Sequence, residues 1–426
     1  MDSLQIDETL HIEQAARLIN LSIKYVRREI ANGSFVSQKK NGRILIDKHS
    51  FLHWKDNQSK KNLNQQNKII KQKRQEDIAN WINIEKEFKE INGWINHLET
   101  TYNCIDLFSG AGGLSCGLVM AGFMPIANIE IMPEAVLTYK NNFSKLKNFN
   151  ENIIAQDIKE ASVKEKLISS IKDKHIHLIS GGFPCQGFSM SGHRIVCDPR
   201  NSLYLDMLDI VEKIRPDFVL MENVEGLRSM LSGAIEKKII NDYKEIGYEI
   251  NVTTLNSADY EVPQIRKRVI FIGNRIGAKN YHPKPLLTSQ NYKTVGDAIL
   301  KFLNVPENQS INHIMTRHSP EMVARMQNVE VGKSLYSHYG DAWKKVNWDK
   351  PSCTVKENHG GVNIHPILNR VMTPRELAAL QSFPDDFIFA GSKKWQLVQI
   401  GNAVPPLLGK AIGLSIIKSL KENNVK

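Results

Sequence analysis

The chain has little cysteine, no apolar run of bilayer length and no phosphate-binding loop of the kind found in ATPases. Its five cysteines, at positions 104, 116, 185, 197 and 353, are odd in number and lack metal-type pairing. This argues for a reducing compartment and against a disulfide framework or a zinc site. No basic stretch followed by an apolar one opens the chain, so no secretory signal is expected. We therefore expect no membrane segment and no metal, and the absence of Gly-x-x-x-x-Gly-Lys-Ser/Thr argues against ATP hydrolysis.

What the chain has in excess is positive charge. Lysine and arginine number 56 against 45 acidic residues, which gives a formal net charge of +11. This favours an anionic partner such as nucleic acid, although charge alone is weak evidence for one. A chain of 426 residues is long enough for two or three domains.

Residues 1–54 have the pattern of a small DNA-binding module. Apolar spacing predicts helices over 12–19 and 22–33, the second ending at a glycine, and Asn41-Gly42 predicts a hairpin over 35–46. Two helices followed by a basic hairpin are typical of a winged helix-turn-helix. The segment resembles excisionase-like and MerR-like modules.

Basic side chains of the second helix and of the hairpin would face phosphates and a groove. They are Lys24, Arg27, Arg28, Lys39, Lys40 and Arg43. We expect the module to bind double-stranded DNA, at the protein's own promoter or nearby, and to be the part that could dimerise. A small protein-interaction module with a solvated basic face is the alternative.

Residues 55–100 begin as a polar linker rich in Lys, Asn, Gln and Glu. Apolar residues from Ile78 to Leu98 then recur at helical spacing and predict a helix that packs on the domain C-terminal to it.

From residue 101 onward, short apolar strands alternate with helical patterns. This alternation predicts a doubly wound α/β sheet with ligands at the carboxyl ends of its strands. Acidic residues lie in or at the ends of four of the expected strands, and two arginines precede another. They are Asp106, Glu130, Asp157 and Glu222, then Arg266 and Arg268.

The first strand leads into a glycine-rich loop, Asp106 to Leu114, that opens a helix. Gly110, Gly112 and Gly113 match the dinucleotide fingerprint only in part, but they let a cofactor approach the helix N-terminus. Glu130 is placed to take two ribose hydroxyls, and Asp157 could accept from an adenine amino group. An adenosine-bearing cofactor without a phosphate cradle suggests S-adenosylmethionine, with S-adenosylhomocysteine as product.

Cys185 lies on a turn after a buried strand, between glycines 181, 182 and 187 and directly after Pro184. The surrounding glycines and proline favour a nucleophile presented into a cleft. An inert buried thiol is the alternative.

Two further features are suited to pyrimidine chemistry. Glu222 could bond the ring nitrogen and exocyclic amine of a pyrimidine and protonate it; the alternative is a helix N-cap. Arg266 and Arg268 could hold a carbonyl or phosphate oxygen; the alternative is alternating charge on an edge strand. A thiolate adding at C6 of cytosine, with N3 protonated, would turn C5 into a carbon that can attack a sulfonium methyl group.

From Tyr102 to the C-terminus the chain resembles the DNA cytosine-5 methyltransferases, with the family's motifs in order. They are Asp106–Ser115, Glu130, Asp157, Pro184-Cys185-Gln186, Glu222-Asn223-Val224, Gln264-x-Arg266-x-Arg268, Arg375–Pro384 and Gln399–Pro406.

The resemblance implies a Rossmann-like methyltransferase sheet and a role for each matching residue. Cys185 would attack C6 of a flipped cytosine, Glu222 would protonate N3, and Arg268 with Arg266 would hold O2. Met132 stands near the position where many family members have an aromatic residue, which puts that stacking contact in doubt. The implied cofactor residues are Asp106, Phe108, Gly110, Gly112, Gly113, Leu114, Glu130, Met132, Asp157, Ile158, Pro184, Asn402 and Val404.

The resulting scheme assigns 1–54 to the helix-turn-helix, 55–100 to the linker and helix, 101–274 to the catalytic domain, 275–372 to target recognition and 373–426 to a return segment. The resemblance further implies a monomeric catalytic unit in the bacterial cytoplasm, near the nucleoid. A cognate restriction endonuclease acting on the same site would be its partner. Two alternatives stay open: a tRNA cytosine-5 methyltransferase, and a transcription regulator with a vestigial enzyme domain. The absence of an Asn/Asp-Pro-Pro-Tyr/Phe motif argues against an exocyclic amino methyltransferase.

Overall fold

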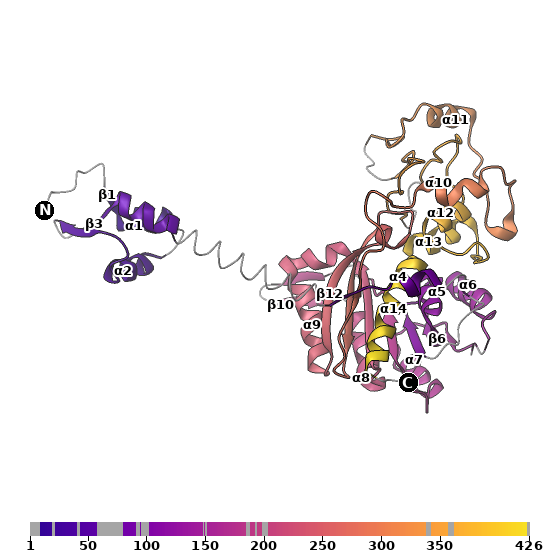
Figure 1. Ribbon diagram of the computed structural model, residues 1–426, viewed down its shortest axis with the longest axis horizontal. Helices are drawn as coiled ribbons and strands as arrows, with labels where there is room; N and C mark the ends of the chain where they lie inside the picture. The colour runs from indigo at the N-terminus through magenta and orange to yellow at the C-terminus, as the bar shows by residue number, and fades with distance from the viewer. Residues whose placement is uncertain are drawn as a thin grey trace. The chain divides into compact units, whose positions relative to one another are not determined.

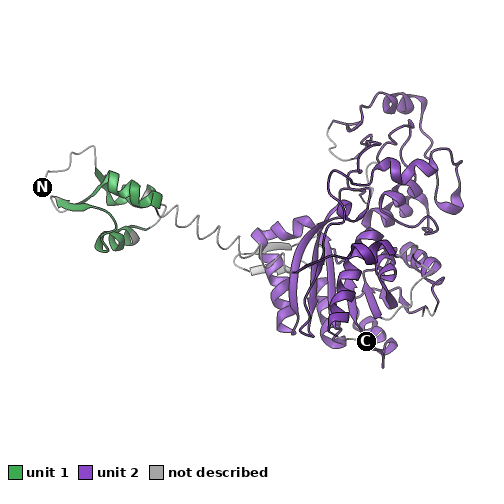
Figure 2. Cartoon of the chain, in the orientation of Figure 1, with its two compact units in different colours: residues 1–79 green, residues 80–426 purple. Residues whose placement is uncertain are grey.

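The computed structural model forms two compact units, residues 1–79 and 80–426 (Figure 2). The residues that it describes are 9–18, 22–40, 43–57, 80–90, 94, 102–147, 149, 151–184, 188–191, 194–197, 203–337, 342–356 and 362–423.

Unit 1 contains a small antiparallel sheet and helices. Its elements are β1 (Thr9–His11), α1 (Ile12–Leu18), α2 (Ile23–Ala31), β2 (Ser37–Lys40), β3 (Arg43–Asp47) and a helical segment over 48–57, and the strands run in the order β1-β3-β2. The helix predicted over 22–33 stops as expected, because Gly33 adopts a φ of +71° that favours glycine. Strand β1 was not predicted. Residues 19–21 and 41–42, which include the Asn-Gly predicted to turn the hairpin, lie outside the described residues.

A core of its own holds unit 1 together. The Phe35 ring meets the rings of Phe51 and Trp54 edge-on, each with centroids 5.2 Å apart. Both α1 and α2 contribute buried residues to this core, among them Ala15 and Val26. Of the predicted DNA-contacting residues, those with described side chains are exposed: Lys24, Arg27, Arg28, Lys39 and Arg43.

Unit 2 is built on a mixed seven-stranded sheet of order β12-β13-β11-β8-β5-β6-β7. Its strands are β5 (Tyr102–Leu107), β6 (Phe123–Ile129), β7 (Ile153–Ile154), β8 (Leu178–Gly181), β11 (Phe218–Val224), β12 (Glu249–Asn256) and β13 (Lys267–Asn274). Strands β7, β6, β5, β8 and β11 are parallel, whereas β13 runs antiparallel to both of its neighbours. The amino end of β13 therefore lies at the edge where the parallel strands have their carboxyl ends.

Helices cover both faces of this sheet (Figure 1). One core contains strand residues such as Val219 and Phe271 with residues of α6 (Pro133–Phe143), α7 (Ala161–Ser170), α8 (Leu203–Ile214) and α9 (Ala234–Glu245). The other contains their sequence neighbours, such as Leu220 and Ile270, with α4 (Glu85–Glu90), α5 (Gly113–Ala121) and α14 (Pro406–Glu422). Alternate residues of a strand point to opposite faces, so Glu222 and Arg268 share the second face.

Glycines let α5 and α14 pack closely. A Cβ added at Gly117 would lie 2.2 Å from the carbonyl oxygen of Pro406, and one added at Gly413 would lie 2.6 Å from the Cβ of Ala121. In the described part of the chain, one helical stretch, within Lys393–Glu422, is long and apolar enough to span a membrane, but 89% of its apolar window is buried. It is a core helix.

The helix predicted from Ile78 to Leu98 is confirmed over α4, which packs on the rest of unit 2 as expected, and is wrong at Trp81–Ile82. Trp81–Ile82 forms strand β4 and pairs with β14 (His282–Pro283), and α4 begins only afterwards. The break has a local cause, because Asn83 Oδ1 accepts a bond of 2.9 Å from the backbone amide of Glu85 and so competes with a continuous helix.

Residues between β14 and α12 (Pro374–Leu380) contain little regular structure. In Figure 1, α10 (Val295–Ile299) and α11 (Pro320–Gln327) lie with α12 and α13 (Lys393–Asn402) to one side of the sheet. This region has a small buried cluster of its own, Met326, Ile364 and Val371. The remaining named elements are β9 (Phe188–Ser191), β10 (Arg194–Cys197), η3 (Glu225–Gly233), η4 (Ser257–Tyr260), η5 (Leu300–Phe302) and η6 (Gln309–Ile311).

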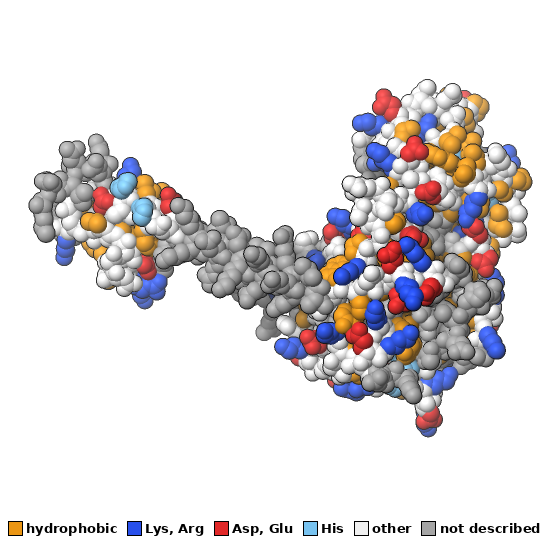
Figure 3. Space-filling view, viewed as in Figure 1, with side chains coloured by type: hydrophobic (Ala, Val, Ile, Leu, Met, Phe, Trp, Pro, Cys, Tyr) orange, Lys and Arg blue, Asp and Glu red, His pale blue; other side chains and the backbone are white. Residues whose placement is uncertain are grey.

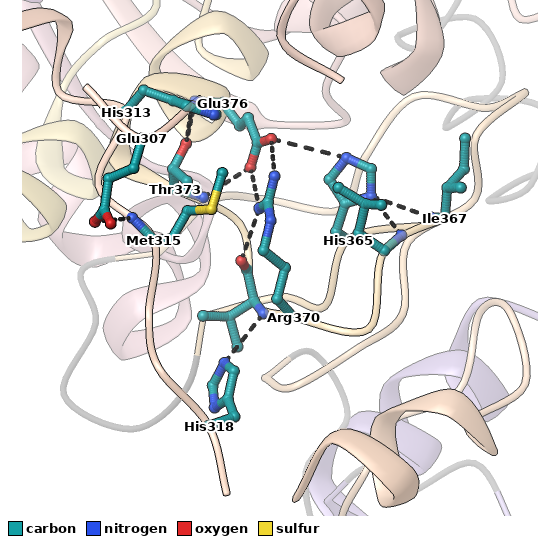
Figure 4. A network of polar contacts seen from close by, with 11 residues as sticks. Glu307, His313, Met315, His318, His365, Ile367, Arg370, Thr373 and Glu376 are labelled. Carbon is teal, nitrogen blue, oxygen red and sulfur yellow. Dashed lines mark hydrogen bonds and ion pairs between the residues drawn. The ribbon is translucent and has the colours of Figure 1, made fainter. Parts of the chain in front are cut away.

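A buried ion pair anchors this region to α12 (Figure 4). The Arg370 guanidinium donates to both oxygens of Glu376, at 2.8 and 2.7 Å, and Glu376 is fully buried. Thr373 and Glu376 also form a capping box at the start of α12. His313 contacts the Thr373 hydroxyl at 3.0 Å. Residues 313, 370, 373 and 376 thus fix the irregular chain against a regular helix.

Candidate functional site

A cavity of about 720 Å³ opens at the carboxyl ends of the parallel strands, beside the amino end of β13. Nearly all of the predicted site residues with described positions line it. They are Asp106, Phe108, Gly110, Gly113, Leu114, Glu130, Met132, Asp157, Ile158, Pro184, Glu222, Arg266, Arg268, Asn402 and Val404. Gly112 is not among the lining residues, and Cys185 lies outside the described residues. Residues that were predicted from the sequence and that are far apart in the chain therefore lie around one cavity.

Asp106 fixes the glycine-rich loop from beneath. It is buried, and its two carboxylate oxygens accept from the hydroxyls of Ser115, at 2.5 Å, and Ser180, at 2.8 Å. Burial raises the pKa of Asp106 to about 6, while the two hydroxyl bonds lower it in part. This side chain joins β5 to α5 and β8.

The three glycines of the loop serve different purposes. A Cβ at Gly112, whose φ is +88°, would lie 2.5 Å from the Phe143 ring, and one at Gly113 would lie 2.4 Å from the Val404 carbonyl oxygen. Only Gly110, with a φ of +53°, has no neighbouring atom within 4 Å of the position for a Cβ. Two glycines therefore allow the protein to pack on itself, and Gly110 leaves open space.

Glu130 is held by backbone amides. Its Oε2 accepts from Gly110, at 2.7 Å, and its Oε1 accepts from Ile131 and Met132, at 2.9 and 2.8 Å. Charge-assisted bonds of this kind fix the carboxylate at the mouth of the loop while leaving lone pairs for further donors.

The cavity lining also combines apolar surface with a second acid. Phe108 is partly buried and has a φ of +58°, and Ile158 is buried. Asp157 Oδ1 accepts from the amide of Lys159 at 3.0 Å. Carboxylates beside apolar groups suit a nucleoside, whose hydroxyls and amino group donate and whose base is flat and apolar.

Glu222 and Arg268 form an ion pair within the cavity lining. Glu222 Oε1 lies 2.9 Å from Arg268 Nε, and the two side chains are only 12% and 13% exposed. Glu222 lies inside β11, and Val224 is the N-cap of the next helix, so the N-cap alternative for Glu222 is wrong. The edge-strand alternative is also wrong, because β13 lies between β11 and β12.

Arg266 is placed differently from Arg268. It is buried, Nη1 donates to the Val355 carbonyl at 2.9 Å, and Nη2 donates to those of Gly401 and Ala403, each at 3.0 Å. Its Nε has no partner among the described residues. Burial, together with the smaller effect of the Arg268 charge, lowers the pKa of Arg266 to about 9. Backbone carbonyl groups therefore take up most of the hydrogen-bonding capacity of this guanidinium.

The segment that leads to Cys185 is fixed beside Glu222. Asn223 Nδ2 donates to the Phe183 carbonyl at 2.8 Å. A Cβ at Gly182 would lie 3.3 Å from Glu222 Oε2, so this backbone passes close to the carboxylate. Phe183 and Pro184 both line the cavity.

Sequence reasoning did not place the segment Thr354–Lys356 at the site, although it also lines the cavity. The Thr354 hydroxyl donates to the Ile265 carbonyl at 2.9 Å, and the Val355 amide donates to Gln264 Oε1 at 2.8 Å. No local pattern marks these residues, since their placement depends on a contact about ninety positions away. Surface charge gives no signal either, because both signs are interspersed on the face of unit 2 drawn in Figure 3.

One group of metal-ligand side chains occurs in the described part of the chain, away from the cavity lining: His175, His177 and Asp217. The Asn103 amide donates to His177 Nδ1 at 3.0 Å, which places the proton of the neutral ring on Nε2. His175 Nε2 lies 2.7 Å from Asp217 Oδ2. These contacts are typical of a histidine–carboxylate network and unsuited to a metal, which needs free ring lone pairs. The expected absence of a metal stays a prediction.

Residues 102–418 match the family model of the C-5 cytosine-specific DNA methylases. The Type II methyltransferase M1.HphI of Haemophilus parahaemolyticus is 41% identical over 329 residues, 74% of this chain and 86% of its own. M.DdeI of Desulfomicrobium norvegicum, another Type II methyltransferase, is 34% identical over 73% of this chain and 87% of its own.

Solved structures give the same result for the fold. The crystal structure of a proposed prophage-encoded DNA modification methyltransferase (E. coli) aligns with a TM-score of 0.61 and 26% identity, over 75% of this chain and all of its own. The methyltransferase EhMeth of Entamoeba histolytica aligns with a TM-score of 0.55 over 76% of this chain and 99% of its own, at 19% identity. The predicted α/β methyltransferase sheet is confirmed.

Proposed function

This chain belongs to the C-5 cytosine-specific DNA methylases, enzymes that take the methyl group from S-adenosylmethionine, and we propose that the cavity described above carries out the transfer. The observation that carries the proposal is that the glycine-rich loop, Glu130 and the Glu222–Arg268 pair line one cavity. The basic N-terminal module and the sizeable region 275–372 argue against the tRNA enzyme, and the intact Cys185, Glu222, Arg268 and Asp106 argue against the vestigial regulator.

The cofactor would lie at the loop end of the cavity. Glu130, fixed by three backbone amides, would accept from the ribose hydroxyls. Asp157 and Ile158 would contact the adenine, and Phe108 would stack on it. Gly110 leaves room for close approach, and Asn402 and Val404 close the site from the C-terminal segment. When bound, S-adenosylmethionine supplies the methyl group.

The target cytosine would lie at the other end, flipped out of the duplex. Glu222 in its acid form would donate a proton to N3, and Arg268 would hold O2. The ion pair between them, with 2.9 Å between Glu222 Oε1 and Arg268 Nε, supports this assignment, because each orients the other before the base arrives. Arg266 is too occupied with carbonyl groups to share that contact in the described conformation.

Cys185 would be the nucleophile. Its thiolate adds to C6, and the ring electrons move to N3, which takes the proton from Glu222. C5 then accepts the methyl group, a base removes the C5 proton, and elimination releases the thiolate. The proposal rests on the Pro184-Cys185-Gln186 motif and on the position of Phe183 and Pro184 at the cavity.

Transfer of tritiated methyl groups to DNA and to tRNA tests the function, and bisulfite sequencing of the modified DNA locates the target. We expect label in DNA only, and none with Cys185→Ala. Duplexes that contain 5-fluorocytosine test the covalent step, because fluorine at C5 cannot leave as a proton and the adduct persists. Wild type and the matched control Cys353→Ala should form a complex stable to denaturant. Methylation by Cys185→Ala would refute the mechanism.

We propose that unit 1 is a winged helix-turn-helix that binds double-stranded DNA, at the protein's own promoter or nearby. The exposed basic residues of α2 and of the β2–β3 hairpin support this. Losing two phosphate contacts should lower the salt slope of binding by about 2. Full-length Lys24→Ala/Arg27→Ala, compared with Lys48→Ala on the following helix, tests it on promoter DNA. An unchanged slope would contradict the proposal.

The remaining assignments follow from family membership and the fold. Residues 275–372, with their separate buried cluster, would carry target recognition, and 101–274 with 373–426 would form a monomeric catalytic unit in the cytoplasm, near the nucleoid. A restriction endonuclease with the same target would be its partner. Digestion of methylated and unmethylated DNA by extracts of the source cell tests for this partner, since only unmethylated DNA should be cut.

A further inference from the structure

A single guanidinium holds two segments that lie on different parts of the cavity wall. Arg266 donates to Val355 from one nitrogen and to Gly401 and Ala403 from another. It is only 2% exposed, so water does not compete for these bonds.

The first segment belongs to the target half of the cavity. Val355 is flanked by Thr354 and Lys356, and all three line the cavity together with Glu222 and Arg268. Gln264 reinforces the same attachment by accepting from the Val355 amide. The position of Thr354–Lys356 is therefore set by two residues of the arginine motif.

The second segment belongs to the cofactor half. Gly401 to Val404 line the cavity, and Val404 lies against Gly113, the first residue of α5. Because a Cβ at Gly113 would come within 2.4 Å of the Val404 carbonyl oxygen, the two backbones cannot move toward each other independently. A shift of the glycine-rich loop is thus passed to Ala403 and to the guanidinium.

Fold stability alone does not explain an arginine at this position. A buried cation costs free energy unless it is paired, and Arg266 bonds to carbonyl groups rather than to a carboxylate. An apolar side chain of similar volume would fill the space at a lower desolvation cost. What it could not do is hold carbonyl groups of two segments from one rigid, planar group.

We propose that Arg266 is a positioning residue that couples the two halves of the cavity, so that bound cofactor and bound target DNA strengthen each other's binding. The inference rests on the proposed function. Coupling of this kind is reciprocal, and it is measured as the factor by which one ligand changes the affinity for the other.

The experiment titrates S-adenosylhomocysteine, which cannot react, into the full-length enzyme with and without a duplex that carries the site mapped by bisulfite sequencing. Wild type should bind it more tightly with the duplex. Arg266→Gln should bind S-adenosylhomocysteine about tenfold more weakly without DNA, as expected for lost charged hydrogen bonds. The factor by which the duplex increases this affinity should fall toward one. Arg268→Gln is the matched control: turnover should fall while cofactor binding without DNA stays at the wild-type level.

Each result decides the question. A folded Arg266→Gln variant that keeps the wild-type coupling factor overturns the proposal, and so does a wild type without coupling. Loss of turnover alone, as in Arg268→Gln, would mean that Arg266 contacts the target. If Arg266→Gln does not fold, Arg266→Lys carries the same test, because its single nitrogen cannot bridge both segments. Failure of the proposed function would be distinct, since wild type would then not methylate DNA.

Discussion

Gly113→Ala tests whether the cofactor loop and the C-terminal segment form one packed unit. The added Cβ would lie 2.4 Å from the Val404 carbonyl oxygen, 3.0 Å from the Ala403 Cβ and 3.1 Å from the Phe383 ring. The closest of these atoms belongs to the backbone, so a rotamer change cannot relieve the contact. Either α5 or the segment that contains Ala403 and Val404 must shift by several tenths of an ångström.

The expected cost combines two opposing effects. Overpacking of a tight interior costs roughly 1–3 kcal/mol. Alanine is favoured over glycine inside a helix by about 0.8–1.0 kcal/mol, and by less at Gly113, the first residue of α5. A net loss of about 1–2 kcal/mol remains. In a unit of this size, with an unfolding entropy of about 2.1 cal/mol/K per residue, it lowers the melting temperature by roughly 1–3 °C.

Calorimetric titration with S-adenosylhomocysteine and thermal unfolding measure the two consequences. If the shift falls on Val404, cofactor affinity should drop about tenfold, which corresponds to about 1.4 kcal/mol. Gly226→Ala is the matched control, because the position for its Cβ has no neighbour within 4 Å and its φ is not positive. Wild-type affinity and melting temperature in Gly113→Ala would refute the packing argument.

Three further predictions concern buried polar groups. Asn223→Ala removes the bond to the Phe183 carbonyl, so kcat should fall about tenfold while cofactor affinity stays unchanged. Steady-state kinetics and calorimetry measure these two quantities. An equal loss of kcat and of cofactor affinity would contradict the anchoring role. Arg370→Met leaves the fully buried Glu376 unpaired and should cost roughly 3–5 kcal/mol in urea denaturation, part of which Arg370→Met/Glu376→Gln should restore. Burial lowers the pKa of Lys410 to about 8, so between pH 8 and about 10.5 the unfolded chain binds more protons at this site. The unfolding free energy of wild type relative to Lys410→Met should therefore rise with pH across that window, and a constant difference would show that burial does not perturb Lys410.

The sheet could be predicted because its strands are short apolar runs that end in polar residues. The pattern that identifies a buried strand is the same in both directions, so it could not reveal that β13 runs antiparallel. The segment around Trp81 was misassigned for a related reason. Helical spacing of apolar residues indicates burial, but Trp81–Ile82 is a strand that is partly buried and pairs with β14, some two hundred residues away in the sequence.

The site residues were recognised as motif members, but a motif does not separate contact from support. Glu222 and Arg268 face the cavity and bind each other. Asp106 stands in the same kind of motif, yet both of its oxygens accept from serine hydroxyls of the protein. Sequence alone gives these acids the same description, because each sits in a buried strand at the same edge of the sheet.

Residues that contact a ligand can be separated from residues that support the site by their hydrogen-bond partners within the protein. A buried polar side chain whose atoms are already bonded to backbone or hydroxyl groups cannot also bind a substrate without breaking those bonds, whereas a carboxylate with spare lone pairs can. By this criterion Arg266 positions other groups. Asp106 keeps lone pairs, but it is only 1% exposed, so burial screens it from a ligand and it too acts by positioning. Glu130, whose oxygens accept three amides and still have lone pairs, can do both. The cavity thus depends on positioning residues and contact residues that share one sequence signature. Substitutions should distinguish the two sets. Loss of a positioning residue should alter both halves of the cavity, and loss of a contact residue should alter one.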